Sequence, residues 1–283
     1  EYTLALLGPK RRNEWGRARM WGSAGYGVGA FAASWTVDWF GWVAVPVQYT
    51  ICSAIAVGIM LKNPAVREHT ETHFKEVVSF TMSHPRLRLF LFCCCVAGVG
   101  FALVTAFLFI YLSNDLDAPK GLFGICIALT VIIELPVFWF APKLHHHISD
   151  RQMFLCSQIA WIVRACGYAA IQTPNQVLPF ETLHGITYGF TSLAGTHFVT
   201  KVYPESLLNS ALGMFHSCFF GIGTFIGNVG GGLLYDHLGP RLMFVIWSAI
   251  TAVMCGWYYT TDKALEAVEP LAVDHLDSSA SDH

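Results

Sequence analysis

Four ionisable residues lie deep inside long apolar stretches near the middle of this chain. Glu134 lies in the first of three successive apolar runs, Arg164 in the second, and Glu181 and His184 in the third. An acid or an arginine at the centre of a membrane helix costs about 2.5–3.5 kcal/mol on insertion scales, so such groups face a bundle interior or a water-filled cavity and pair there. The pattern predicts the coupling centre of a membrane transporter, where buried charges exchange protons and partners.

Arg164 needs a buried carboxylate partner because its guanidinium stays protonated at physiological pH. Glu134 lies on the preceding apolar run, and we predict that it exchanges a proton and the Arg164 guanidinium in turn. At 1.5 Å per residue, Arg164 lies about 10 Å from the outer end of its run and Glu134 about 20 Å from its own, which weighs against a direct bond. The alternative is a static ion pair that only fixes the packing of the bundle.

His184 is predicted to bind a solute or relay protons because an imidazole changes charge near neutral pH. The alternative is a packed histidine that bonds to neighbouring backbone. Glu181 lies three residues earlier on the same helical face, so these two side chains can also pair. Trp161 and Tyr188 are predicted to stack on a sugar or a nucleobase, whereas most membrane aromatic residues fill cores and interfaces.

The composition is that of a membrane protein. Of the 283 residues, 54% are hydrophobic and 13% are charged, against about 25% charged in an average soluble domain. The net charge of −2 argues against a nucleic-acid partner. All nine cysteines lie in apolar runs and are interpreted as structural. We expect no cofactor and no metal, and we interpret His145, His146 and His147 as solvated residues of a turn.

The fold class is predicted to be all-α and polytopic, with about 20 mostly apolar residues in each membrane span. Eight full transmembrane helices are expected, and they cover residues 18–37, 42–61, 87–112, 121–141, 152–171, 177–200, 206–235 and 242–261. Thirteen of the 17 Lys and Arg residues fall on the side of the first loop and two on the other. This bias predicts a multi-pass protein with a cytoplasmic carboxyl terminus. No oligomeric state is indicated.

Small residues repeat at four-residue spacing in two of these helices. Gly25 and Gly29 form one such pair, and Gly223, Gly227 and Gly231 form a series. Faces of this kind let two helix backbones approach closely in lipid. We interpret both as packing seams rather than ligand sites.

Several motifs in order along the chain resemble one transporter family. Gly-Arg-Ala-Arg-Met-Trp-Gly at 16–22 looks like the start of the fifth helix of lactose permease and its relatives. Glu134-Leu-Pro and Thr182-Leu-His-Gly resemble the eighth and tenth helices of bacterial nucleoside–proton symporters. Arg164 falls where lactose permease keeps a buried arginine in its ninth helix. The chain is therefore similar to the lactose-permease-like branch of the major facilitator superfamily.

The resemblance implies a twelve-helix fold of two six-helix bundles around a central cavity with alternating access. Residues 1–61 would then be the remnant of an amino-terminal bundle (the end of helix four and helices five and six), and 62–86 the central cytoplasmic loop. Residues 87–261 would be the carboxy-terminal bundle of helices seven to twelve, and 262–283 a disordered acidic tail. On this view the sequence is an amino-terminally truncated fragment.

The same resemblance assigns roles to further residues. Glu1 and Arg19 correspond to a sugar-binding acid and arginine of lactose permease, although Arg19 can instead snorkel to the interface. Gly232-Leu-Leu-Tyr-Asp-His-Leu-Gly-Pro-Arg241 resembles a loop signature of the superfamily, so Asp236 and Arg241 are expected to latch helix ends. The sequence departs from lactose permease at Thr187, which replaces an acid, and at Glu181, which replaces a lysine.

These patterns favour a secondary active transporter of a small polar solute such as a sugar or nucleoside, coupled to protons by symport. Its partners would be the solute, protons and the lipid bilayer. The alternative is a non-transporting relative that acts as a receptor or scaffold, with its charges kept for folding. An enzyme is not expected, because the sequence contains neither His-Glu-x-x-His nor Gly-x-Ser-x-Gly.

Overall fold

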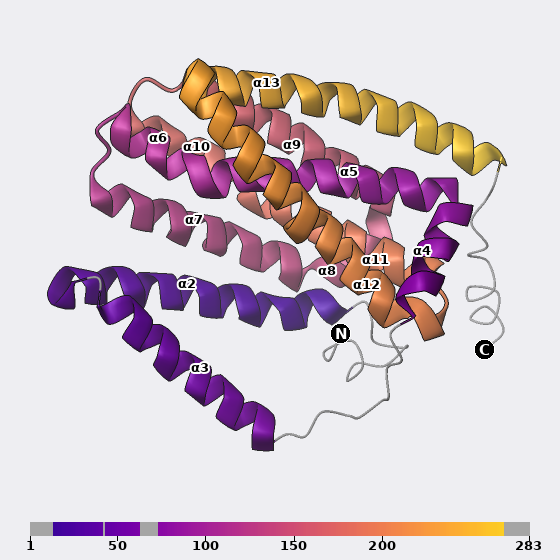
Figure 1. Cartoon of the computed structure of the whole chain (residues 1–283), viewed down its shortest axis with the longest axis horizontal. Coiled ribbons are helices and arrows are strands. Elements are labelled where there is room, and N and C mark those ends of the chain that lie inside the picture. The colour runs from indigo at the N-terminus through magenta and orange to yellow at the C-terminus, as the bar shows by residue number, and fades with distance from the viewer. Residues whose placement is uncertain (1–13, 42, 63–72, 269–283) are drawn as a thin grey trace.

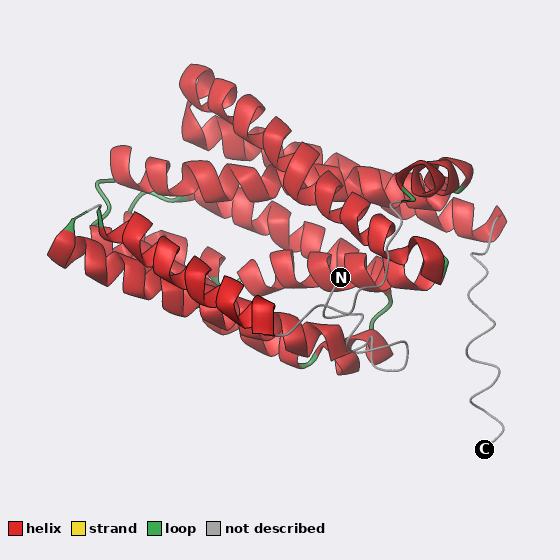
Figure 2. Cartoon of the chain, turned by 60° about the horizontal axis from the view of Figure 1, so that its bottom comes forward, coloured by secondary structure: helices red, strands yellow, loops and turns green. Residues whose placement is uncertain are grey.

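The structure is a computed structural model that describes residues 14–41, 43–62 and 73–268, and every regular element in these ranges is a helix (Figure 2). The α-helices in chain order are α2 (Trp15–Phe40), α3 (Ala44–Lys62), α4 (Phe74–Ser83), α5 (Pro85–Ala102), α6 (Phe109–Asn114), α7 (Lys120–Trp139), α8 (Ala141–His147), α9 (Asp150–Ala170), α10 (Leu178–Glu181), α11 (Thr191–Val202), α12 (Leu208–His216) and α13 (Thr224–Val268). The 3₁₀ helices are η3 (Pro174–Val177) and η5 (Glu205–Leu207), and the π-helices are η2 (Leu103–Leu108), η4 (Gly185–Phe190) and η6 (Ser217–Gly223).

Four helical segments of the described chain are long and apolar enough to cross a membrane, namely 85–114, 121–139, 150–170 and 205–267. The last has 63 residues, far more than the roughly 20 that one crossing needs. It turns back at Gly239, where φ is 78° and ψ is 165°, a conformation that glycine adopts without steric cost. Figure 1 shows the two arms of this segment meeting at a sharp corner. The total of eight spans stays a prediction.

The predicted span at 177–200 is not one continuous helix. It consists of η3, α10, a turn, η4 and α11. Pro174 and Pro179 lie at its start, and neither can donate a backbone hydrogen bond inside a helix. Only the type of helix changes along this segment, because Leu178, Thr182 and His184 all keep right-handed helical dihedral angles.

Two segments that were expected to be irregular are partly helical. The central loop 62–86 contains α4, in which Val77 and Thr81 are buried on one face and Thr81 bonds Tyr203 at 2.5 Å. The first residues of the acidic tail expected at 262–283 are helical, because α13 continues to Val268, and residues 269–283 lie outside the described residues. In both places charged residues suggested a loop, whereas apolar residues at helical spacing decided the structure.

The helical extension of α13 takes part in an ionic cluster at one end of the bundle. Asp262 is buried, accepts a hydrogen bond from Arg86 of α5 at 3.0 Å, and is also bonded by Arg151 of α9. Glu266 lies 2.5 Å from the same Arg151 side chain. One carboxylate therefore joins three long helices at this end.

Glycines set the closest approaches between helices. A Cβ added at Gly223 or Gly227 would lie 2.4 Å from the Cys95 carbonyl oxygen and 2.7 Å from the Ala102 Cβ, respectively. The seam predicted for this helix is confirmed, and its partner is α5. The seam predicted at Gly25 and Gly29 has no partner among the described residues, because an added Cβ meets none of them within 4 Å at either position.

The helix α2 uses other glycines to lie along α7 and α8. A Cβ at Gly16 would lie 2.4 Å from the Ala141 Cβ, and one at Gly27 would lie 2.9 Å from a methyl group of Val131. In Figure 1, α2 runs beside α7 while α3 diverges from it. The outer faces of α2 and α3 expose large apolar side chains such as Trp21 and Phe31, as expected of surfaces that face lipid.

Candidate functional site

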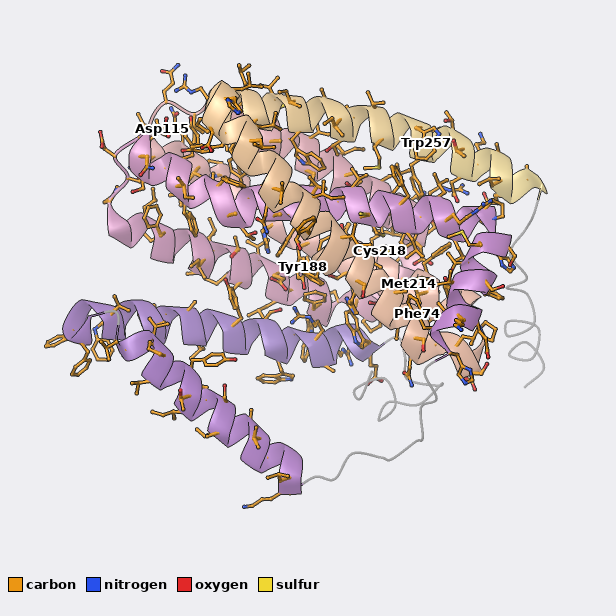
Figure 3. The ribbon with its side chains drawn as sticks, in the orientation of Figure 1. Phe74, Asp115, Tyr188, Met214, Cys218 and Trp257 are labelled. Carbon is orange, nitrogen blue, oxygen red and sulfur yellow. The ribbon has the colours of Figure 1, made fainter. Side chains whose placement is uncertain are left out.

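A cavity of about 380 Å³ lies between α2 and the rest of the bundle. Its wall combines a polar side with an apolar side. The polar and ionisable lining residues are Arg19, Ser23, Tyr26, Thr105, Thr130, Glu134, Arg164, Glu181, His184 and Tyr188. The apolar lining side chains are Phe101, Val104, Leu108, Phe109, Ile127 and Phe220. Figure 3 labels Tyr188, which lies near the middle of the molecule on the side of the bundle that faces α2.

Three π-helices contribute to the cavity wall. Leu108 comes from η2, Tyr188 from η4 and Phe220 from η6. A π-turn widens a helix locally and occurs often at functional sites. These three segments lie in separate helices of the chain, and the sequence analysis did not predict any of them. Their convergence on one cavity singles it out as the candidate site.

Arg164 forms the densest polar cluster in the described chain. The side chain is fully buried, and its Nη2 lies 3.1 Å from Glu181 Oε1. Its Nε donates to Tyr168 Oη at 2.9 Å, and its Nη1 donates to Thr187 Oγ1 at 2.9 Å. Tyr168 also donates to Glu181 Oε1. Every nitrogen of the guanidinium is therefore bonded, as a buried charge requires.

The predicted direct pairing of Arg164 with Glu134 is wrong. The carboxylate that pairs with Arg164 is Glu181, which lies on α10 where that helix packs against α9. The predicted Glu181–His184 pair is also replaced, since Glu181 bonds to Arg164 and Tyr168.

Glu134 instead joins α7 to α2. It is buried, and its Oε1 accepts a hydrogen bond from Ser23 Oγ at 2.6 Å. Arg19, one turn earlier on α2, donates to Ser23 Oγ at 3.3 Å and to Tyr188 Oη at 2.9 Å. The carboxylate of Glu134 and the guanidinium of Arg19 thus belong to one network through Ser23.

His184 lies between the two acid–arginine groups. Its Nδ1 is 3.3 Å from Arg164 Nη1, and its Nε2 is 3.8 Å from Glu134 Oε2. A guanidinium can only donate, so Nδ1 accepts and the proton of the neutral ring lies on Nε2, facing the carboxylate. Two acids, two arginines and a neutral imidazole therefore form a continuous polar chain from α2 to α10.

The family model described as "MFS_1 like family" matches residues 1–246 of this chain. The chain belongs to this family. It is an integral, multi-pass membrane protein, in keeping with its apolar helices.

Curated proteins that are similar to this chain include a probable transporter and two permeases. The probable 3-phenylpropionic acid transporter of Escherichia coli (strain K12) is 22% identical over 82% of this chain and 62% of its own length. The sucrose permease of Escherichia coli is 21% identical over 90% of this chain and 64% of its own length. The xanthosine permease of Escherichia coli (strain K12) is 21% identical over 54% of this chain and 40% of its own length. The chain therefore spans less than two thirds of each of these relatives.

The remaining predicted site residues do not line the cavity or lie outside the described residues. Trp161 is buried, its ring is 5.1 Å from the Arg164 guanidinium, and it is not among the lining residues. Arg241 bonds Tyr111 Oη and the Ile171 carbonyl, each at 3.2 Å, and so ties the corner of α13 to the ends of α6 and α9. Asp236 is exposed, and Glu1 lies outside the described residues.

Three polar residues of the site were not predicted to take part in it, although Thr187 had been noted as a replacement for an acid. Ser23, Tyr168 and Thr187 each bond to a charged member of the network. Tyr168 lies four residues after Arg164, a spacing that puts two side chains on the same helix face, and this signal was available. The bond between Ser23 and Glu134 joins residues 111 positions apart, and no local pattern in one sequence indicates it.

Proposed function

We propose that this chain forms the solute- and proton-binding part of a secondary active transporter that works by alternating access. The observation that supports the proposal best is the cavity lined by both acid–arginine groups. The solute is proposed to be small and polar, of the sugar or nucleoside class. Its hydroxyl groups would bond to Arg19, Glu134 and Tyr188, while a ring would lie against the apolar wall around Phe101 and Phe220.

The proposed proton carrier is Glu134. As a carboxylate it accepts a charge-assisted hydrogen bond from Ser23, which holds α2 against α7. Such bonds are worth about 1.5–3 kcal/mol, against about 0.5–1.5 kcal/mol for neutral pairs. Binding of a proton to the carboxylate would remove the charge and weaken the contact between the two helices. Release of the proton would restore that contact.

His184 is proposed to orient rather than to carry the proton. Its Nδ1 faces a guanidinium that never accepts a hydrogen bond, so a second ring proton would break the contact with Arg164. The Nε2–H side faces Glu134 and can donate to the carboxylate when the helices approach. Arg164 and Glu181 would act as a fixed electrostatic frame behind this histidine.

The second candidate function is a receptor or scaffold that transports nothing. Two features favour it. Thr187 takes the position of an acid in lactose permease, and the buried Arg164–Glu181 pair has all its hydrogen bonds within the protein. In that case the charge network would serve folding only.

Uptake by proteoliposomes with an imposed pH gradient tests the proposal. The solute panel would contain sucrose, xanthosine and 3-phenylpropionate, and the variants would be Glu134→Gln and the control Glu266→Gln, which lies at the far ionic cluster. We expect gradient-driven accumulation that Glu134→Gln abolishes while downhill exchange survives, and that Glu266→Gln preserves. Accumulation unaffected by Glu134→Gln would show that Glu134 has a structural role. Absence of any transport over the panel would favour the receptor or scaffold.

A further inference from the structure

A cluster of two histidines and an aspartate lies away from the cavity. His145 comes from the last turn of α8, Asp150 from the first residue of α9, and His197 from α11. One nitrogen or oxygen of each side chain lies within 4.8 Å of the others. His145 was predicted to be a solvated residue of a turn, but its side chain is only 8% exposed.

Hydrogen bonding within the protein satisfies only part of this cluster. His197 Nδ1 lies 2.8 Å and 2.9 Å from the two carboxylate oxygens of Asp150, so that histidine has a partner. His145 Nδ1 is buried, has no hydrogen-bond partner in the described part of the chain, and lies 3.7 Å from Asp150 Oδ1. The two imidazole rings stack with centroids 4.3 Å apart. A buried nitrogen aimed at a carboxylate without bonding to it is costly unless something binds between them.

We propose that His145, Asp150 and His197 bind a zinc ion. Two imidazoles and a carboxylate are a common ligand set for zinc with one position left for water. Tetrahedral ligands at about 2.0–2.1 Å from the ion lie about 3.3 Å apart. The observed separations of 2.8 Å and 3.7 Å from Asp150 Oδ1 lie on either side of that value. The two imidazole rings are nearly parallel, at 23° to each other, so both would turn about their side-chain bonds to point a lone pair at one ion.

The site would join the three helices α8, α9 and α11. α8 follows α7, which carries Glu134, and α9 carries Arg164. α11 follows η4, which carries Tyr188. A bound ion would fix the ends of these helices relative to one another without touching the cavity. The start of α9 is already fixed by a capping box between Ser149 and Gln152, so the backbone at Asp150 is held in place.

Calorimetric titration of the purified, metal-free chain with zinc chloride tests the proposal, using a chain without a polyhistidine tag. We expect one ion to bind per chain. His145→Gln, His197→Gln and Asp150→Asn should each weaken binding by at least about tenfold, since even the loss of a residue that only hydrogen-bonds to a metal ligand costs that much. The matched control is the double variant His146→Gln/His147→Gln, which removes the two exposed histidines beside His145, leaves all three proposed ligands in place and should bind as the wild type does.

A second variant covers the case in which a glutamine substitution prevents folding. His145→Cys keeps a zinc ligand and should retain binding, and with cobalt in place of zinc it should add a thiolate-to-metal absorption band. Each variant would be compared with the wild type by its metal-free thermal unfolding curve. The proposal is overturned if the wild type binds no zinc, if His145→Gln and His197→Gln bind as tightly as the wild type, or if the control double variant abolishes binding.

Discussion

Arg164 and Glu134 show how differently two buried charges can be held in one cavity wall. Every nitrogen of the Arg164 guanidinium donates a hydrogen bond to a residue of the carboxy-terminal helices. The carboxylate of Glu134 bonds across to Ser23 of α2 and only approaches His184. The Arg164 guanidinium already has a hydrogen-bond partner for each nitrogen, whereas the Glu134 carboxylate lies at a contact between α2 and α7 that can open. This contrast is why the proton step is assigned to Glu134.

The Arg164–Glu181 pair is expected to stabilise the fold rather than to take part in coupling. Removal of one member of a buried ion pair leaves the other charge unpaired, which costs about 3–5 kcal/mol. Glu181→Ala and Arg164→Ala should therefore each lower the unfolding temperature in detergent strongly. Glu181→Ala/Arg164→Ala should cost less than the two single variants added together, since it leaves no unpaired charge.

The measurement is thermal unfolding of the three variants beside the wild type, followed by circular dichroism. Tyr203→Phe serves as a control, because it removes a buried hydroxyl bonded to Thr81 without creating a buried charge. Strict additivity in the double variant would contradict a direct interaction between Arg164 and Glu181. A single variant as stable as the wild type would show that the pair contributes nothing to the fold.

At the scale of helices, the crossing of α5 with η6 and α13 depends on glycine. A Cβ at Gly227 would meet the Val99 carbonyl oxygen and the Ala102 Cβ, each at 2.7 Å. Gly227→Val should separate the two helices and destabilise the bundle by about 1–3 kcal/mol, the usual cost of overpacking. Gly230→Val is the matched control, since a Cβ there meets nothing within 4 Å.

The expected result is a lower unfolding temperature for Gly227→Val and little change for Gly230→Val, measured in the same detergent. Both substitutions place a β-branched residue in the same helix, so their difference reports the contact and not helix propensity. Equal losses in the two variants would mean that the crossing tolerates a wider separation than the structure shows.

The apolar runs predicted most of the helices, because about 20 apolar residues in succession leave the chain few alternatives in lipid. They did not predict where the helices break. The 177–200 run has the pattern of one span, yet it contains 3₁₀, α- and π-helical segments in succession. The predicted Arg164 partner was wrong because the position of a residue along its own run does not indicate which carboxylate of a neighbouring helix faces it. Nothing in the amino-acid composition indicated the π-helices either.

Which charged residues share the cavity was predictable because a buried charge must be paired. Which residue pairs with which was not, because pairing depends on tertiary contacts between distant elements. The Gly25 and Gly29 spacing illustrates the same limit. It has the pattern of a packing seam, but the face that α2 presents to α7 carries Gly16 and Gly27 instead.

At the scale of the molecule, α2 meets the rest of the bundle along one line of contacts. Gly16 and Gly27 allow the close approach to α8 and α7, and the bonds of Ser23 and Arg19 lie between them. If residues 1–61 and 87–261 form separate bundles, as proposed, this line is the boundary between them. Alternating access would then require the boundary to open and close around the cavity.

A disulfide across this boundary should stop transport. A Cβ at Gly27 would lie 3.3 Å from the Val131 Cβ, close to the range of about 3.5–4.5 Å that disulfides require. Oxidation of Gly27→Cys/Val131→Cys in proteoliposomes should link α2 to α7 and reduce solute uptake to the level of empty liposomes. Treatment with dithiothreitol should restore uptake. Gly25→Cys/Val131→Cys is the control pair, because position 25 faces open space and should neither cross-link nor lose activity on oxidation. Cross-linking would be followed by mass spectrometry against the background of the nine native cysteines. Full uptake by a completely cross-linked protein would show that α2 and α7 move together, and the opening would then have to occur at another boundary.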